Sequence, residues 1–439
     1  MLYSYLSMPF IAIFGLNEFS VRLLAAVLGS LALLVFYSLA RRIRGEGFGL
    51  LALFLLATNP WHIQISRWAL ESNILPFFLL LGIWLLVLAR EHDSIRYLVL
   101  SAASFALALY AYGAAFIFLP IFFIISCIYL IKKCEMGFKT FLPAILVFSV
   151  IAMPIVFCNL FNTLGIGEVK VLGITLPELT ESRAVATTVF SKGGNVEKAF
   201  ENFGNFIKLL WTQNDGQPWS SNNHFGVMYG VPGLIVFVFG LFGFLRRLRK
   251  KAISSSEFFL FFALLAAFAS AVFIDVKIVR INMVWIPIIY FQALGLYFVI
   301  KAIGDNALYP VVATISILCF LFTLDYFSRQ QKVLSSHFFG GLGAAIEYAE
   351  QLDSDFIQIT DVNMPYIYVL FYNKIPPQNF IDDVIYNNPT AAFKQVISFS
   401  KYCFWNDPPF DRTAMIARNA YPGGIVMGRY DNYTVTLIP

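Results

Sequence analysis

Long apolar segments recur along the first three quarters of the sequence, separated by short polar and charged stretches. Each segment has close to the roughly 20 residues that an α-helix needs to cross a bilayer. A short amphipathic segment before the first of them, Tyr3–Leu16, could lie along the membrane surface. The pattern predicts about ten membrane-spanning helices, at residues 19–40, 47–63, 73–90, 96–112, 114–131, 139–161, 227–245, 257–274, 282–300 and 307–325.

The last quarter of the sequence has a different pattern, because charged and polar residues return between shorter apolar runs. Its periodicity predicts helices and strands in a small α/β domain of roughly 110 residues, which is large enough for its own core. The predicted fold is therefore a polytopic α-helical membrane domain, residues 1–326, with a large connection at 162–226, followed by a water-facing α/β domain, residues 327–439. The predicted elements of this domain are helices 343–351 and 365–372 and strands 356–360, 424–429 and 433–438.

Composition supports lipid as the solvent of the chain. Of the 439 residues, 59% are hydrophobic and 13% are charged, whereas soluble chains have roughly 45–50% apolar and about 25% charged residues. The net charge is only +5, and the densest basic run, residues 246–251, directly follows an apolar helix. That position is typical of a membrane flank, so we expect no nucleic-acid partner. No cysteine pair has metal-ligand spacing and no disulfide framework is expected, for the five cysteines Cys127, Cys134, Cys158, Cys319 and Cys403.

Basic residues gather at alternate ends of the predicted helices. Because cytoplasmic connections are enriched in Lys and Arg, the richer set of ends is predicted to be cytoplasmic. The connection 162–226 and the residues after Ser328 are then extracytoplasmic, in a plasma (inner) membrane protein. The basic residues of the richer set are Arg41, Arg42, Arg44, Arg90, Arg96, Lys132, Lys133, Lys139, residues 246–251 and Lys301.

Ionisable residues between spans are the first candidates for a site, because charges near the membrane are costly and tend to be functional. The connection 59–73 holds His62, Arg67 and Glu71. Arg67 and Glu71 are four residues apart and would pair on a helical turn. They form either an interfacial ion pair, or a site in which Arg67 holds a phosphate and Glu71 accepts a proton.

Two further connections carry candidate ligands. The short connection 275–280 contains Asp275, Lys277 and Arg280, and its cations would bind an anionic lipid headgroup or serve as ordinary loop charges. The 162–226 connection ends in a Trp-, Asn- and Asp-rich stretch that includes His224, which suits carbohydrate or a turn-rich loop. Nucleotide-binding and zinc-protease motifs are absent from the sequence, so ATP-driven transport is unsupported.

These segments carry a family resemblance. The stretch Asn59-Pro-Trp-His-Ile-Gln-Ile-Ser-Arg67 with the carboxylate of Glu71, the stretch Arg280-Ile-Asn-Met-Val-Trp-Ile-Pro, and residues 3–23, 224–233 and 365–372 occur in order along nearly the whole chain. Together they resemble the integral membrane glycosyltransferases of the family 39-like group, which contains dolichyl-phosphate-mannose–protein mannosyltransferases and aminoarabinose transferases.

The resemblance implies a GT-C fold and transfer of a sugar from a polyprenyl-phosphate carrier to a glycan, lipid or protein acceptor on the outer face of the membrane. Glu71 matches an acidic position where members more often have Asp, and Arg280 matches a basic position near the carrier phosphate. Family members also have an N-terminal helix and a first external loop with an acidic residue. These would precede Met1, so the base that deprotonates the acceptor is expected to be missing.

Several functions stay open at this point. The polyprenyl-phosphate-linked sugar would be the donor, no cofactor is required by the motifs, and a divalent metal is an open alternative without candidate ligands. Glu71 is the candidate catalytic residue. A non-catalytic truncated paralogue that binds carrier lipid is one alternative function, and a lipid or solute transporter is the other. The candidate substrate- and carrier-binding residues are Arg67, His62, Arg280, Lys277, Asp275 and His224.

Overall fold

The computed structural model of the chain describes residues 2–133, 138–171, 174–176, 196–387, 389, 394–405 and 410–439. They form two compact units. The first contains most of residues 1–324, and the second contains residues 325–439 together with residues 11–20.

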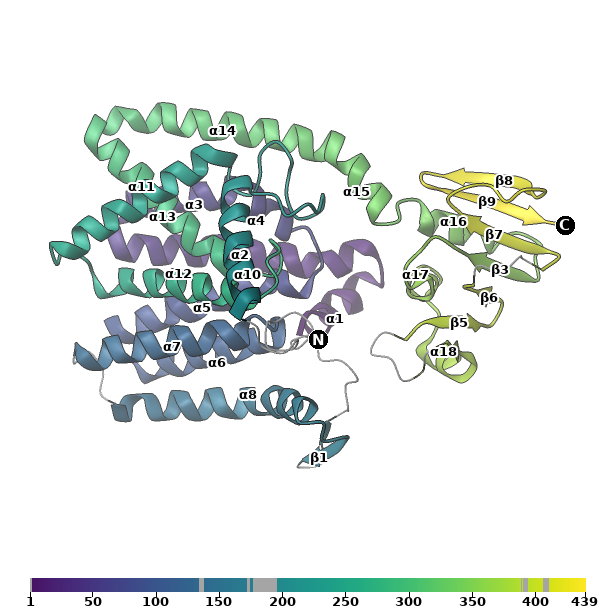
Figure 1. Cartoon of the computed structure of the whole chain (residues 1–439), viewed down its shortest axis with the longest axis horizontal. Helices are drawn as coiled ribbons and strands as arrows, with labels where there is room; N and C mark the ends of the chain where they lie inside the picture. Colours follow the sequence, from purple (N-terminus) through teal and green to yellow (C-terminus); the bar gives the residue numbers. More distant parts are fainter. Residues whose placement is uncertain are drawn as a thin grey trace. The chain divides into compact units, whose positions relative to one another are not determined.

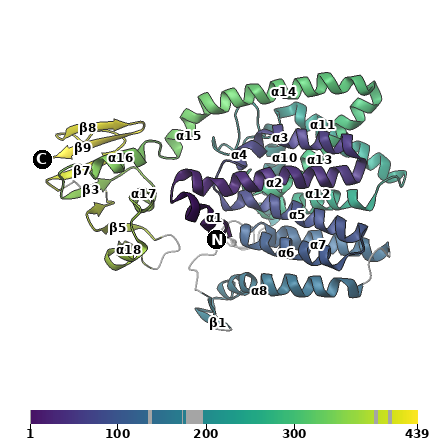
Figure 2. The same ribbon diagram turned by 180° about the vertical axis from the view of Figure 1, so that it is seen from behind.

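The first unit is helical, and within the described residues eight of its apolar segments are long enough to cross a membrane. The chain is thus a multi-pass membrane protein. Figures 1 and 2 show its long helices side by side and roughly parallel. The helices of these eight segments are α2 (Glu18–Arg44), α5 (Glu71–Glu91), α7 (Ala115–Lys132), α8 (Leu142–Thr163), α11 (Gly230–Arg249), α12 (Ser255–Phe273), α13 (Trp285–Ile303) and α14 (Leu308–Asp325), which continues through a π-helical turn into α15 (Gln331–His337).

Two of the ten predicted spans are not among these eight segments, because their helices have 17 residues or fewer. The prediction at 96–112 corresponds to α6 (Ile95–Ala111, 17 residues). The prediction at 47–63 is wrong in its extent, because α3 (Glu46–Thr58, 13 residues) stops before a separate helix, α4 (Pro60–Ile65). Asn59 ends α3 and its side chain accepts a hydrogen bond from the backbone N–H of His62 (3.3 Å). Pro60 fits the first turn of α4, where a backbone N–H is not needed.

Burial distinguishes the centre of the helical unit from its lipid-facing rim. The spans of α5 and α13 are 89% and 78% buried inside the protein, whereas those of α8 and α11 are each 17% buried. Large apolar side chains on these outer helices, such as Leu146 and Phe242, are therefore exposed. Lipid is their natural surrounding, as in other membrane helices.

Glycine residues allow α11 and α13 to pack in close contact. A Cβ on Gly240 of α11 would lie 1.8 Å from the backbone oxygen of Phe291 on α13, and one on Gly295 would lie 2.2 Å from that of Val236. The two backbones touch, so only glycine fits at these positions.

A buried charge cluster joins three helices at the end that carries the basic residues. Glu257 of α12 is 1% exposed. Its carboxylate lies 2.7 Å from Nη2 of Arg44 on α2 and 3.2 Å from Nη1 of Arg247 on α11. A buried carboxylate needs such partners, since an isolated buried charge would be strongly destabilising.

The predicted connection 162–226 contains a helix that the sequence analysis did not anticipate. After the short strands β1 (Val169–Val171) and β2 (Ile174–Leu176), helix α10 (Val196–Thr212) packs on α11 and α12. Residues 172–173 and 177–195 of this connection lie outside the described residues, as does Cys134. The other four cysteines are free. The segment predicted at Tyr3–Leu16 is helix α1 (Leu2–Phe14).

The second unit is a seven-stranded mixed sheet with helices, in the strand order β4-β5-β6-β3-β7-β9-β8. The parallel pairs are β3–β6 and β3–β7, and the other pairs are antiparallel. The five predicted elements are confirmed as α16 (Leu342–Ala349), β3 (Phe356–Ile359), α17 (Pro365–Tyr372), β8 (Ile425–Tyr430) and β9 (Tyr433–Ile438). The sequence did not predict α18 (Pro377–Asp383), β4 (Ile385–Tyr386), β5 (Val396–Phe399), β6 (Tyr402–Cys403) and β7 (Thr413–Ala417).

Candidate functional site

Three connections of the helical unit meet at the short helix α4. They are residues 59–70 between α3 and α5, residues 213–229 between α10 and α11, and residues 274–284 between α12 and α13. The backbone N–H of Trp61 donates to the oxygen of Val227 (3.2 Å), and its indole Nε1 donates to Oδ1 of Asn282 (3.0 Å). All the candidate site residues predicted from the sequence belong to these three connections or to the first turn of α5.

Asn282 joins the first and third connections. It begins the 3₁₀ turn η3 (Asn282–Val284) and is 0% exposed. Its Nδ2 donates to the backbone oxygen of Ser72 and to Oδ1 of Asn73, both at 3.0 Å. Asn73 in turn donates to the oxygen of Trp68 (3.0 Å). Buried side chains with all their hydrogen bonds made hold a backbone in one arrangement.

Asp215 joins the second and third connections. One carboxylate oxygen accepts from the backbone N–H of Ile278 (2.9 Å), and the other accepts from the hydroxyl of Ser220 (2.6 Å). The ammonium of Lys277 donates to the backbone oxygen of Asp215 (2.9 Å). Sequence reasoning singled out Lys277 but gave Asp215 and Asn282 no individual role, although both are polar residues beside apolar helices.

The third connection presents its arginine to solvent. Nη1 of Arg280 lies 3.3 Å from Oδ2 of Asp275, with the two side chains 33% and 45% exposed. An ion pair at this exposure contributes little to stability. A guanidinium has five N–H donors, so one contact with Asp275 leaves Arg280 capable of binding an anion such as phosphate.

Arg67 and Glu71 do not share a helical turn, so that part of their prediction is wrong. Helix α4 ends at Ile65, residues 66–70 form turns and extended chain, and α5 begins at Glu71. Arg67 is exposed and Glu71 is half-buried. A carboxylate in the first turn of a helix is stabilised by the helix dipole. Glu71 has this position in α5, two residues before Asn73, whose side chain is hydrogen-bonded to Asn282 and Trp68.

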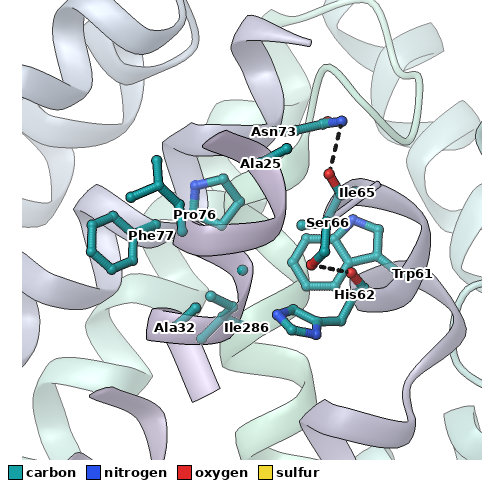
Figure 3. Close-up of a pocket in the computed structure, with 12 residues that line it drawn as sticks. Ala25, Ala32, Trp61, His62, Ile65, Ser66, Asn73, Pro76, Phe77 and Ile286 are labelled. Carbon is teal, nitrogen blue, oxygen red and sulfur yellow. Dashed lines mark hydrogen bonds between the residues drawn. The ribbon is translucent and has the colours of Figure 1, made fainter. Parts of the chain in front are cut away.

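His62 faces a pocket between α2, α4 and α5. The pocket has about 280 Å³ of empty volume, its open mouth included. Figure 3 shows Trp61, His62 and Ser66 along one side, with Pro76 and Phe77 opposite. His62 is 5% exposed, and within the described part of the chain its Nε2 has no hydrogen-bond partner. Burial lowers the pKa of His62 to about 4, against the smaller opposing effect of the Gly29 backbone, so its imidazole is neutral at pH 7.

His224 lies in the second connection, on an exposed turn. The backbone N–H groups of His224 and Phe225 donate to Oδ1 of Asn222 (2.8 and 3.1 Å). The hydroxyl of Tyr229 donates to the backbone oxygen of Thr58, which ties the same connection to the end of α3. The structure thus brings the connection of His224 to the connections of Glu71 and Arg280. Searched over the described residues, the chain has no cluster of three or more His, Cys, Asp or Glu suited to a metal ion.

Comparisons with known proteins were made for the whole chain. Residues 1–160 match the sequence model of the family described as dolichyl-phosphate-mannose-protein mannosyltransferase. No curated protein matches the sequence. The structure of ArnT from Cupriavidus metallidurans bound to undecaprenyl phosphate is similar over 99% of this chain and 87% of ArnT, with a TM-score of 0.57 and 12% identity. AglB from Archaeoglobus fulgidus, in complex with an inhibitory peptide and a dolichol-phosphate, is similar over 84% of this chain and 55% of its own, with a TM-score of 0.43 and 14% identity.

These findings confirm two predictions. The predicted resemblance holds over residues 1–160, which match the mannosyltransferase family model. The helical membrane architecture with a C-terminal sheet unit is the fold of ArnT. At 12% identity this likeness concerns the fold alone, so the role of each residue is argued from its own surroundings in this chain.

Proposed function

We propose that this protein is a glycosyltransferase that moves a sugar from a polyprenyl-phosphate carrier to a glycan, lipid or protein acceptor. The observation that carries the proposal is the meeting of three connections at one end of a membrane-spanning unit. Bonds through Asn282 and Asp215 join the segments that carry Glu71, Lys277 and Arg280. The family match over residues 1–160 supports a lipid-phosphate donor.

The carrier phosphate would bind the third connection. Among the described residues, the ion pair with Asp275 occupies one of the five N–H donors of Arg280, and the Arg280 side chain is one-third exposed. Lys277 is held in place by the backbone oxygen of Asp215, and an ammonium has three N–H donors, so it can bind a phosphate as well. Two cations at this point would stabilise the negative charge that collects on the departing phosphate. Arg67 is a third cation, from the first connection.

The transfer would be a single displacement. An acceptor oxygen attacks the anomeric carbon of the sugar, the bond between that carbon and the phosphate oxygen breaks, and polyprenyl phosphate leaves with the electron pair. The acidic residue that serves as base in the family has no counterpart among the candidate residues, so Glu71 is proposed to receive the acceptor proton in its place. His62 and His224 are proposed to bind the substrates, and Asp275 to orient Arg280.

We also propose that the site and the C-terminal α/β domain predicted at residues 327–439 face the outside of a plasma (inner) membrane. The support is the basic residues at the opposite ends of the spans, among them Arg42, Arg44, Arg90 and Lys301. A reporter enzyme that is active only outside the cytoplasm, fused after Pro439, should be active. If the fusion after Pro439 were inactive and a second fusion, in the connection at residues 250–254, were active, the orientation of the protein in the membrane would be the opposite of the proposed one.

The function is tested with purified protein in liposomes and radiolabelled polyprenyl-phosphate sugars. Arg280→Ala and Glu71→Gln should each lower kcat/KM by about 100-fold or more. The matched control is Lys301→Ala, an exposed basic residue at the other end of α13, which should keep the wild-type rate. Wild-type transfer rates in both site variants would show that the assignment of Arg280 and Glu71 to the site is wrong. A carrier that crosses the bilayer without any sugar transfer would instead identify a transporter.

A further inference from the structure

Helix α10 has an apolar face that no protein segment covers within the described residues. Its buried face, which includes Phe206 and Leu209, packs on the helical unit. A second face consists of five large apolar side chains that are 49–73% exposed, namely Val196, Phe200, Phe203, Ile207 and Trp211. Their spacing of four, three, four and four residues places them along one side of an α-helix.

The charged residues of α10 occupy a third face. Glu197, Glu201 and Lys208 are exposed. At 100° per residue they lie about a quarter turn from the apolar stripe, on the side away from the buried face. The helix therefore has one side for protein, one apolar side and one polar side. A helix that lies at a membrane surface has an apolar side turned to the acyl chains and a polar side turned to water, often with Trp at the boundary.

The contacts of α10 place it at the end of a span. Nδ2 of Asn202 donates to the backbone oxygen of Val272 (3.2 Å), and the rings of Phe206 and Phe268 meet edge to face with centroids 4.9 Å apart. Both partners belong to the last turns of α12, which ends at Phe273. Figure 1 shows α10 running across the direction of α12 and α13. A crosswise helix at the end of a span lies at the depth of the lipid headgroups.

The C-terminal end of α10 leads into the candidate site. Gln213 follows the helix, and its Oε1 accepts from the backbone N–H groups of Met228 and Gly230, both at 3.0 Å. Two residues later, Asp215 holds Ile278 and Lys277. Hydrogen bonds of Gln213 and Asp215 therefore join the end of α10 to the connection that carries Arg280.

We infer that α10 is an interfacial helix whose stripe of Val196, Phe200, Phe203, Ile207 and Trp211 inserts into the lipid headgroup boundary and sets the depth of the third connection, residues 274–284. The occupant of the apolar face is the bilayer. The stripe is continuous along the helix and belongs to a unit whose neighbouring span α11 already exposes Ile235 and Phe242. The inference rests on the proposed function in one respect: the depth of the third connection in the membrane would suit the phosphate of a lipid carrier.

The experiment uses the full chain with its cysteines replaced, a single nitroxide label and reconstitution in phosphatidylcholine liposomes. Labels at Phe203→Cys and Ile207→Cys should collide with oxygen, which concentrates in lipid, more than with a water-soluble nickel complex. Labels at the matched control positions, Glu201→Cys and Asn205→Cys, should show the reverse. Equal nickel access at all four positions would place the stripe in water and overturn the inference. Access by neither reagent would mean that protein covers it, either a second copy or another segment, and would overturn it as well.

The depth role is tested by a label at Val279→Cys in the connection beside Arg280. The double change Phe203→Asp and Ile207→Asp should increase the nickel accessibility of this label about threefold or more, because the stripe no longer enters lipid. Asn205→Asp, on the polar side of α10, is the control and should leave it unchanged. An unchanged label in the double variant would refute the coupling. Neither readout depends on sugar transfer, so a failure of the proposed function would be seen separately in the liposome assay.

Discussion

Replacing Asn282 by alanine should weaken both the helical unit and the candidate site. The side chain is completely buried and makes three hydrogen bonds, to Trp61, Ser72 and Asn73. Asn282→Ala leaves the indole N–H of Trp61 and the side-chain oxygen of Asn73 buried without this partner. Each orphaned group costs about 1–3 kcal/mol, and the small cavity adds to it, so we expect a loss of about 3–5 kcal/mol.

The loss is measured as the thermal unfolding midpoint of the purified protein in detergent. A change of this size should lower the midpoint by roughly 5–8 °C for a helical unit of this length. Asn205→Ala is the matched control, since Asn205 is exposed on α10, and it should change the midpoint by about 1 °C or less. At a temperature where the variant stays folded, Asn282→Ala should also lower sugar transfer about 10-fold or more, because the two connections are no longer held together.

A second variant separates the network from general damage. Trp61→Phe removes the indole N–H together with part of the buried ring, and the cost of the lost ring volume is common to the single and the double variant. The double variant Trp61→Phe, Asn282→Ala should therefore be less destabilised than the sum of the two single changes by about 1 kcal/mol or more. Strict additivity, or a midpoint within about 1 °C of wild type for Asn282→Ala, would refute the reasoning. A lowered midpoint with full transfer activity would leave Asn282 a stabilising residue without a positioning role.

Three further predictions concern stability, each measured by the same unfolding midpoint. Glu257→Gln leaves the largely buried Arg44 without its counter-charge and should cost about 3–5 kcal/mol, whereas Asp305→Asn, whose side chain is 81% exposed, should have almost no effect. Gly240→Ala forces α11 away from α13 and should cost about 2 kcal/mol or more, whereas Gly47→Ala, with open space around it, should be neutral. Because the pKa of His62 is lowered to about 4, protons bind the unfolded chain first, so stability should fall from pH 6.5 to pH 4 by roughly 3 kcal/mol. His62→Gln should remove that part of the pH dependence, and an equal fall in the variant would contradict it.

The membrane-spanning helices could be predicted because their signal is local. About 20 apolar residues in a row have one stable environment, so α5 and α12 were located within a few residues. The end of α3 was also marked in the sequence, since Asn followed by Pro is a helix-start signal. The apolar length of residues 47–63 outweighed that signal, and the prediction joined α3 to α4.

Helix α10 was missed for a different reason. It lies in a stretch assigned to a connection, and amphipathic helices lack the unbroken apolar run that marks a span. The 3.6-residue periodicity of Phe200, Phe203, Phe206 and Leu210 was present in the sequence and would have predicted a helix. What no periodicity could supply is the division of its apolar residues between the protein face and the exposed face.

The charged residues of the candidate site could be predicted from the sequence, and its uncharged polar residues could not. Charged residues gave the clearest signal, and Glu71, Lys277 and Arg280 lie in, or directly after, the connections that the structure joins. Sequence reasoning gave no role to Asn282, whose partners are 209–221 residues away in the sequence. Contacts at that separation depend on how the helices pack, and an uncharged polar residue beside a span gives no local sign of its partners.

In the candidate site, uncharged residues are buried and hold the connections together, whereas the arginine is partly exposed. This difference follows from the energetic cost of burying a charge. Had Arg280 been buried, it would have required a carboxylate within the protein, as Arg44 has Glu257, and its donors would be occupied. Instead, neutral buried groups such as Asn282 and Gln213 satisfy the backbones of the connections, so Arg280 stays partly exposed and makes one weak ion pair, with Asp275, among the described residues. A cation in that position can release Asp275 and bind a phosphate at little cost in stability. Asp275→Asn should therefore leave the unfolding midpoint nearly unchanged and alter the KM for the lipid donor, which a site built on a stabilising ion pair would not do.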